Sequence, residues 1–297
     1  MTKIRSSDSS MIDDRRGGGG GGGFSFPGMG GGGMGFPIKA GGGILGLLLV
    51  LAATFLPRIL NSGTSTSQLG GDNQSADVAD GACNSELEQI VCGAEVDVQD
   101  YWSTALPKFY GVQYTPARME LVEGSFETGC GGATSDVGPF YCPADQRVYI
   151  DLVFMQQLED RLIGTTNDLA EQYIVAHEFG HHVQNLLGIN ARVQQASQND
   201  PAKANQYSVA LELQADCFAG AWVSSAAARG LLESTDEINE ALDAAAGVGD
   251  DRIQQQTQGH VDKDSWTHGS AEQRQTWFRR GFDTADPTQC TTVDEVL

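Results

Sequence analysis

Near the middle of the chain stands the stretch Tyr173-Ile174-Val175-Ala176-His177-Glu178-Phe179-Gly180-His181-His182-Val183-Gln184. Residues four apart on an α-helix are neighbours on one face, so His177 and His181 can bind the same metal ion. Glu178 follows the first of these histidines and can reach a water molecule held on that metal. The order His-Glu-x-x-His is the pattern in which one helix offers zinc two imidazoles and a general base. The stretch therefore predicts a catalytic zinc site.

The residues around this motif predict a helix that can carry it. Apolar side chains recur at helical spacing, at Leu169, Tyr173, Ala176, Val183 and Leu187. Asn167 or Asp168 can cap the start of this helix, and Gly188 can end it.

A second predicted helix offers the third metal ligand. It begins at Asp200 and Pro201, and it can run to Arg229 with Gly230 as its end. Glu212 in this helix is our choice for the ligand, because two His and one Glu with an open water position form a standard catalytic zinc site. Asp216 lies one turn further on the same face, where it can accept the free ring N–H of a zinc-bound His.

The alternative for these two carboxylates is a solvated helix face. Their neighbours argue against it, since they are apolar: Leu211, Leu213, Ala215, Phe218 and Ala219. A carboxylate in such surroundings needs a partner.

The charge of the chain excludes one class of partner. The net charge is −21 at pH 7, and it is unevenly distributed. Residues 1–60 hold six Lys/Arg and three Asp, whereas the rest of the chain holds 12 Lys/Arg and 36 Asp/Glu. A surface this acidic repels nucleic acid and anionic lipid headgroups, so we expect no nucleic-acid partner.

The six cysteines indicate disulfide bonds rather than a structural zinc cluster, because none of them form a C-x-x-C pair. Disulfides point to an oxidising compartment. Six cysteines allow 15 pairings. Nearness in sequence favours Cys83–Cys92 and Cys130–Cys142, which leaves Cys217–Cys290.

Three segments are predicted to precede the folded domain. Residues 1–39 are polar and then glycine-rich, so we expect a disordered tail. Residues 40–60 are apolar and nearly long enough to span a bilayer, with the Lys and Arg residues concentrated before them. We expect an uncleaved signal anchor that leaves the N-terminus in the cytoplasm, with a cleaved signal peptide as the competing interpretation. Residues 61–82 are a predicted linker, and residues 83–297 are the predicted zinc-binding domain.

Within that domain the pattern predicts mainly helices and a small sheet. Helices are expected over residues 85–110, 153–162 and 234–256, and over 271–281 with a capping box of Ser270 and Gln273 and with Gly281 as its end. Residues 118–123 and 147–152 are the predicted strands. The second strand ends about 25 residues before His177. We expect it to line the cleft and pair with an extended substrate; an ordinary internal strand is the alternative.

Four segments together resemble the neutral zinc metallopeptidase family, whose members are bacterial and membrane-anchored. These segments are residues 177–184, 212–220, 138–143 (Gly-Pro-Phe-Tyr-Cys-Pro) and 267–274 (Thr-His-Gly-Ser-Ala-Glu-Gln-Arg), and the match covers roughly residues 83–290. The paired His-Glu-x-x-His and Glu-x-x-x-Asp motifs are also similar to those of prenyl-protein-peptidase-like zinc proteases. The resemblance implies an α+β, mainly helical zincin-like domain with a small β-sheet, preceded by one transmembrane helix and a disordered tail.

The same resemblance implies a role for each site residue. His177, His181 and Glu212 bind Zn²⁺, Glu178 is the general base, and Asp216 supports a ligand histidine. His268 lies in a region similar to a His-rich motif of the related proteases, so it or Arg274 is a candidate to stabilise the oxyanion, with a structural capping role as the alternative. His182 points about 100° away from His181 around the helix and is expected to be a packing or surface residue.

These observations predict a membrane-anchored, extracytoplasmic, zinc-dependent endopeptidase of the bacterial cell membrane. Its substrate is a peptide or protein, and zinc is its cofactor. The alternative is a catalytically inactive, membrane-anchored zinc-binding scaffold or interaction protein. Glu178 argues against the alternative, because a structural zinc site has no use for this carboxylate.

Overall fold

The computed structural model describes residues 2–16, 82–158, 168–232, 234 and 236–297. The strands are β1 (Ile12–Asp14), β2 (Arg118–Leu121), β3 (Ser125–Thr128), β4 (Gly131–Thr134), β5 (Phe140–Cys142) and β6 (Arg147–Ile150). The longer helices are α2 (Glu86–Tyr110), α4 (Asp168–Leu186), α5 (Ile189–Asn199), α6 (Ala204–Ala228), α7 (Asp236–Gly247), α8 (Asp250–Gln258) and α9 (Ala271–Thr284). Two short helices, α3 (Leu152–Leu158) and α10 (Thr292–Val296), and several 3-10 turns complete the described chain. The fold is α+β and mainly helical, as predicted.

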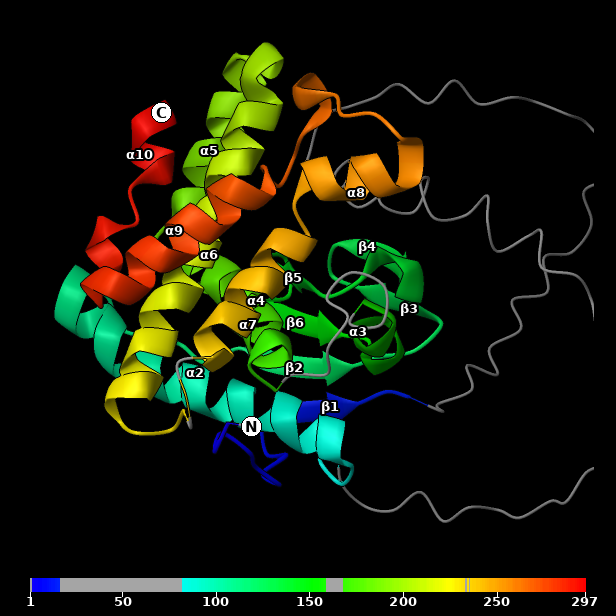
Figure 1. Cartoon of the computed structure of the whole chain (residues 1–297), viewed down its shortest axis with the longest axis vertical. Coiled ribbons are helices and arrows are strands. Elements are labelled where there is room, and N and C mark those ends of the chain that lie inside the picture. The colour runs from blue at the N-terminus through cyan, green and yellow to red at the C-terminus, as the bar shows by residue number, and fades with distance from the viewer. Residues whose placement is uncertain (1, 17–81, 159–167, 233, 235) are drawn as a thin grey trace, which may run out of the picture.

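A four-stranded sheet has the order β1-β2-β6-β5. Strands β1, β2 and β6 run parallel, and β5 runs antiparallel to β6. Figure 1 shows this sheet to one side of the stacked helices α4, α6, α7 and α9, with α2 running along the base of the view.

The two faces of the sheet are covered differently. On the inner face, Met119 and Ile150 are fully buried and belong to the same core cluster as Trp102 of α2 and Phe179 of α4. On the other face lies the β3–β4 hairpin, where Phe126 stacks on Tyr149 and on the neighbouring ring of β5. The main core therefore lies between the sheet, α2 and α4, and it fixes the position of the helix that carries the His-Glu-x-x-His motif.

The three predicted disulfides are present: Cys83–Cys92, Cys130–Cys142 and Cys217–Cys290. The second ties the turn of the β3–β4 hairpin to β5, and the third ties α6 to the segment before α10. The capping box expected at Ser270 and Gln273 is present, and α2 begins with a second one at Ser85 that was not predicted.

The prediction that residues 1–39 are a disordered tail is wrong for residues 2–16. Ile12 and its neighbours form β1, which pairs in parallel with β2, and Ile4 and Ile12 are buried in the core. The segment folds because these two apolar side chains and the strand backbone find partners far away in the sequence. Residues 17–39 lie outside the described residues.

The substrate-pairing prediction for residues 147–152 is also wrong. The corresponding strand, β6, is hydrogen-bonded to β2 on one side and to β5 on the other. Its backbone groups are therefore already paired, and it is the internal strand of the alternative interpretation. At this end of the four-stranded sheet the edge strand is β5.

Two helix boundaries differ from expectation. The predicted helix over residues 234–256 is two helices, α7 and α8, separated at Val248 and Gly249. Gly281 does not end α9, which continues to Thr284.

The predicted membrane anchor, residues 40–60, lies outside the described residues. Among the residues that the structure describes, no helix is both long and apolar enough to cross a bilayer.

Glycine at position 281 is needed for helix packing. A Cβ placed there would lie 1.8 Å from the carbonyl oxygen of Cys217 in α6, and a Cβ on Gly220 would lie 2.0 Å from the carbonyl oxygen of Phe278 in α9. The backbones of α6 and α9 thus touch at two glycines, and the obstacle to a side chain is main chain rather than a flexible side-chain end.

Gly281→Ala should therefore lower the free energy of unfolding by about 3 kcal/mol, the upper part of the range for overpacked cores. Urea unfolding followed by circular dichroism measures this. Thr276→Ala, on the exposed side of the same helix, is the control and should stay within about 0.5 kcal/mol of the wild type. Equal stability of Gly281→Ala and the wild type would show that the helices are not in contact here.

Candidate zinc site

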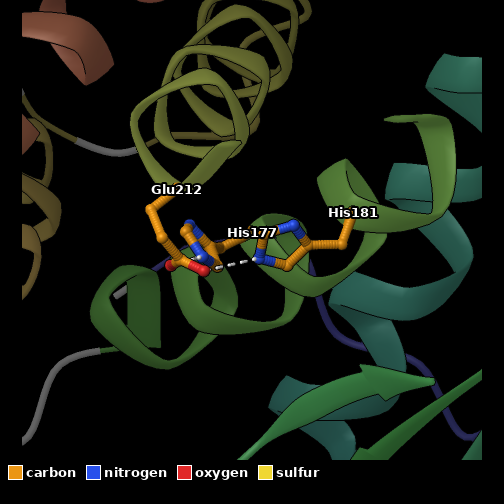
Figure 2. Close-up of side chains that lie close together, drawn as sticks. All are labelled: His177, His181 and Glu212. Carbon is orange, nitrogen blue, oxygen red and sulfur yellow. Dashed lines mark hydrogen bonds and ion pairs between the residues drawn. The ribbon is translucent and has the colours of Figure 1, made fainter. Parts of the chain in front are cut away.

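Two adjacent helices bring the three predicted ligands together. His177 and His181 lie one turn apart on α4, and Glu212 reaches them from α6, as Figure 2 shows. His177 Nε2 is 3.1 Å from Glu212 Oε2, and His181 Nε2 is 3.5 Å from Glu212 Oε1. One potential ligand atom from each residue lies within 4.8 Å of those of the other two. All three predicted ligands thus converge on one point.

A glycine between the two histidines lets the helices approach this closely. A Cβ on Gly180 would lie 3.1 Å from Cα and 3.2 Å from the carbonyl oxygen of Ala215. Gly180 is the second x of the His-Glu-x-x-His motif. It faces the turn of α6 between Glu212 and Asp216. A larger residue would push the third ligand away from the first two.

Both histidines present the same ring nitrogen to Glu212, because their other nitrogen is occupied. His177 Nδ1 lies 2.8 Å from Asp216 Oδ1, and His181 Nδ1 lies 2.8 Å from the amide oxygen of Gln184. Both partners are acceptors, so each Nδ1 carries the proton and each Nε2 can offer its lone pair to a metal. Two imidazoles in this tautomer and one carboxylate match the donor set of a catalytic zinc ion.

Asp216 is held in the interior by a network that ties three helices together. It is fully buried, and Arg274 of α9 binds both of its oxygens, through Nε and Nη2 at 2.8 Å each. Tyr173 of α4 donates its hydroxyl proton to Oδ1 and accepts from Arg274 Nη2 at 3.1 Å. Asp216 thus contacts the His177 ring where the prediction requires it, and Arg274 and Tyr173 position Asp216.

The electrostatics of the site follow from this burial. Burial by itself would raise the pKa of Asp216, but Arg274 and His177 outweigh it and bring the pKa to about 2. Burial opposes the ionisation of Glu212 too, yet the histidines, His181 foremost, hold its pKa well below the usual range. Burial lowers the pKa of His177, whereas Asp216 and Glu212 raise it to about 10. Two ionised, buried carboxylates thus favour positive charge at the point where the ligands meet, which suits a divalent cation.

The match to known proteins agrees with this geometry. Residues 1–293 match the family described as "Putative neutral zinc metallopeptidase". The chain belongs to this family.

Relatives from two bacterial groups share most of the chain. The protein YpfJ of Escherichia coli K12 is 50% identical over 200 residues, covering 67% of this chain and 69% of that protein. The protein Rv2575 of Mycobacterium tuberculosis H37Rv is 47% identical over 212 residues, covering 68% of this chain and 69% of that one. Both relatives are named only as uncharacterized proteins, so they assign no substrate. No solved structure matches the chain.

Glu178, the predicted general base, is nine-tenths buried beside the predicted ligands. Burial raises the pKa of its carboxyl group, while the charges of His181 and His177 lower it in part. Among the described residues no hydrogen bond ties down its carboxylate, in contrast to Glu212 and Asp216. A carboxyl group with a raised pKa and no fixed partner is suited to accept and return a proton.

His268 lies in the loop that precedes α9, and this loop packs against α6 beside Glu212. A Cβ on Gly269 would lie 3.2 Å from Val209 and 3.3 Å from Leu213, which flank Glu212 on α6. Asp250 of α8 holds this loop: its Oδ2 accepts the backbone N–H groups of residues 267, 268 and 269, and its Oδ1 lies 3.1 Å from His268 Nδ1. The His268 side chain keeps 17% exposure. The loop thus brings a third oriented histidine to the edge of the site.

Arg274 is not available for the oxyanion role that the sequence allowed. Its guanidinium is 4% exposed and already bonded to Asp216, Tyr173 and the carbonyl oxygen of Val248. His182, expected to be a packing or surface residue, is completely buried, with Nδ1 3.0 Å from the Tyr141 hydroxyl and Nε2 2.7 Å from the carbonyl oxygen of Thr115.

Sequence reasoning missed the orienting role of three residues: Tyr173, Gln184 and Arg274, the last of which acts through Asp216. Spacing offered a signal for the first two. Tyr173 lies four residues before His177 and Gln184 lies three after His181, so both share the metal-binding face of α4. For Arg274 there was no local signal, because its partner is 58 residues away.

Asp216→Asn should weaken zinc binding by about 10- to 100-fold, because an amide is a poorer acceptor for the His177 ring proton and leaves Arg274 uncompensated. Competition with a chromophoric chelator measures the affinity. The control is Asp283→Asn on the exposed face of α9, which should bind zinc like the wild type. An unchanged affinity in Asp216→Asn would contradict the role assigned to this network.

Proposed function

We propose that the chain is an extracytoplasmic zinc-dependent endopeptidase, anchored in the bacterial cell membrane through residues 40–60. The observation that carries the peptidase assignment is the convergence of His177, His181 and Glu212, with the Nδ1 atom of each histidine against an acceptor and with Glu178 beside them. A structural zinc site closes with a fourth protein ligand, whereas the described residues supply three. The fourth position is thus left for water and substrate.

Each residue around the site has a task in peptide hydrolysis. When bound, zinc polarises the scissile carbonyl and lowers the pKa of its water to about 7. Glu178 accepts the proton of the attacking water and returns it to the leaving amine, so that the amine departs uncharged. Asp216 and Gln184 hold His177 and His181 in register throughout. His268, oriented by Asp250, is our candidate for a donor to the oxyanion.

The edge strand β5 supports an extended peptide as the substrate. It ends the sheet next to α4, and the Tyr141 hydroxyl in this strand bonds to His182, the residue after the ligand His181. An extended peptide can add to such an edge through main-chain hydrogen bonds, which bind it with little regard for its side chains. We therefore propose that β5 takes the role that the sequence assigned to β6.

The three disulfides support an extracytoplasmic location, because such bonds persist in oxidising compartments. The apolar composition of residues 40–60 supports membrane anchoring. The acidic remainder of the chain argues against a nucleic-acid partner.

Glu178→Gln should reduce hydrolysis of an unfolded protein substrate by about 10²- to 10⁴-fold, the range for loss of a general acid–base group. It should leave zinc bound, since Glu178 is not a ligand. His177→Ala should lose activity and zinc together. The measurement is cleavage of fluorescently labelled casein by the purified full chain loaded with zinc, with metal content determined on the same samples.

Two results would contradict the assignment. If Glu178→Gln cleaves casein at the wild-type rate, Glu178 is not the base. If wild type and variant bind zinc equally and neither cleaves any of a panel of unfolded proteins, the inactive zinc-binding scaffold becomes the better account.

A further inference from the structure

Residues 2–16 are built into the same fold as the zinc site. The strand β1 completes the sheet by pairing with β2, with Ile12 opposite Met119 and Asp14 opposite Leu121. Figure 1 shows this segment, in blue, at the β2 edge of the sheet and beneath α2. Its apolar side chains Ile4 and Ile12 are about 5% exposed and belong to the core cluster that contains Phe179 of the zinc-binding helix.

The first residues of the segment bind the zinc-binding helix directly. Gln172 of α4 has no exposed surface, and both ends of its amide are satisfied by this segment. Thr2 donates to the Gln172 oxygen at 3.0 Å, and Gln172 donates to the carbonyl oxygen of Ile4 at 2.6 Å. Arg5 pairs with Asp168 at the start of α4, at 2.8 Å. Without the segment, a buried amide five residues before His177 would lose its partners.

Helix α2 has a gap in its side chains where the segment crosses it. A Cβ on Gly93 would lie 2.7 Å from Arg5 Cα and 2.7 Å from the carbonyl oxygen of Ile4. A glycine inside a helix is destabilising relative to alanine. Gly93 therefore lowers the stability of α2. A larger residue at this position would clash with the backbone of residues 4 and 5, which explains why a glycine stands here.

Ion pairs hold the C-terminal end of the segment, residues 13–16, in place. Asp13 pairs with Arg118 of β2 and, at 2.8 Å, with Arg147 of β6. Arg16 pairs with Glu88 of α2 at 2.6 Å. The segment is thus attached by a strand, two core side chains, a buried amide and ion pairs to four separate elements.

We infer that residues 2–16 are an integral part of the folded zinc-binding domain and lie on the same side of the membrane as the zinc site. A strand cannot pair with a sheet across a bilayer. The prediction that residues 1–39 stay in the cytoplasm while the domain is outside therefore cannot hold together with this packing, and the membrane attachment that we propose for residues 40–60 must leave both of their ends on that one side. Whatever path residues 17–81 take, the chain enters and leaves them on one side. The inference rests on packing alone and holds whether or not the chain hydrolyses peptides.

Thiol labelling of the full chain in spheroplasts tests the shared compartment. All six native cysteines are paired, so a single new cysteine reports its own location. Ser10→Cys places one on the segment and Arg279→Cys places one on α9; both positions are exposed. We expect a membrane-impermeant maleimide to label both variants equally, either before or only after permeabilisation. Labelling of Arg279→Cys in intact spheroplasts, with Ser10→Cys labelled only after permeabilisation, would overturn the inference.

Hydrogen exchange of the purified full chain tests the docking. Amides of residues 11–16 should exchange at least about tenfold more slowly than in an unstructured peptide. Gly93→Ala should abolish that protection and speed exchange in residues 168–176 of α4, while α2 itself stays protected because alanine favours the helix. Thr104→Ala, exposed on α2, is the matched control and should leave exchange unchanged. Unprotected amides in the wild type, or full protection in Gly93→Ala, would overturn the inference.

Discussion

The buried carboxylate of Asp216 is the group on which the rest of this structure depends. An ionised carboxylate in a protein core is tolerated only when opposite charge and hydrogen bonds replace the lost water. Here Arg274 supplies the charge, and Tyr173 and His177 supply further hydrogen bonds. These partners come from α9 and α4, while Asp216 itself is on α6. The hydrogen bonds of this one carboxylate therefore require three helices to converge. The same contacts place the Nδ1 atom of His177 against an acceptor, which leaves Nε2 to face the predicted metal site.

Three glycines at the contacts between these helices allow them to converge. Helix α6 must approach α4 on one side and α9 on another, closely enough for short side chains to reach across. Gly180 allows the first approach, and Gly220 with Gly281 allows the second. The Cys217–Cys290 disulfide follows Asp216 directly and ties the same helix to the end of the chain. Packing and chemistry are therefore constrained by the same few positions of α6.

Much of the zinc site could be predicted from the sequence, because its residues lie in two short motifs, each within one helix. Helical spacing alone places His177 beside His181 and Glu212 beside Asp216, and apolar neighbours indicate that these carboxylates are buried. Residue spacing does not show which distant segments pair with each other. β1 is three residues long with two aspartates, so it has no alternation to recognise, and its partner β2 begins 104 residues later. For the same reason the sequence does not show that β6 is paired on both sides, or that Gly281 contacts α6 inside α9 instead of ending that helix.

We propose that His177, His181 and Glu212 bind a catalytic zinc ion. X-ray absorption at the zinc edge of the full chain, loaded with one equivalent of zinc, tests this ligand set. We expect two imidazole nitrogens and two oxygens, at about 2.0–2.2 Å, in four-coordinate geometry. The Glu212→Ala variant should lose one protein oxygen from that shell. A sulfur shell at about 2.3 Å, or a spectrum unchanged in Glu212→Ala, would contradict the account.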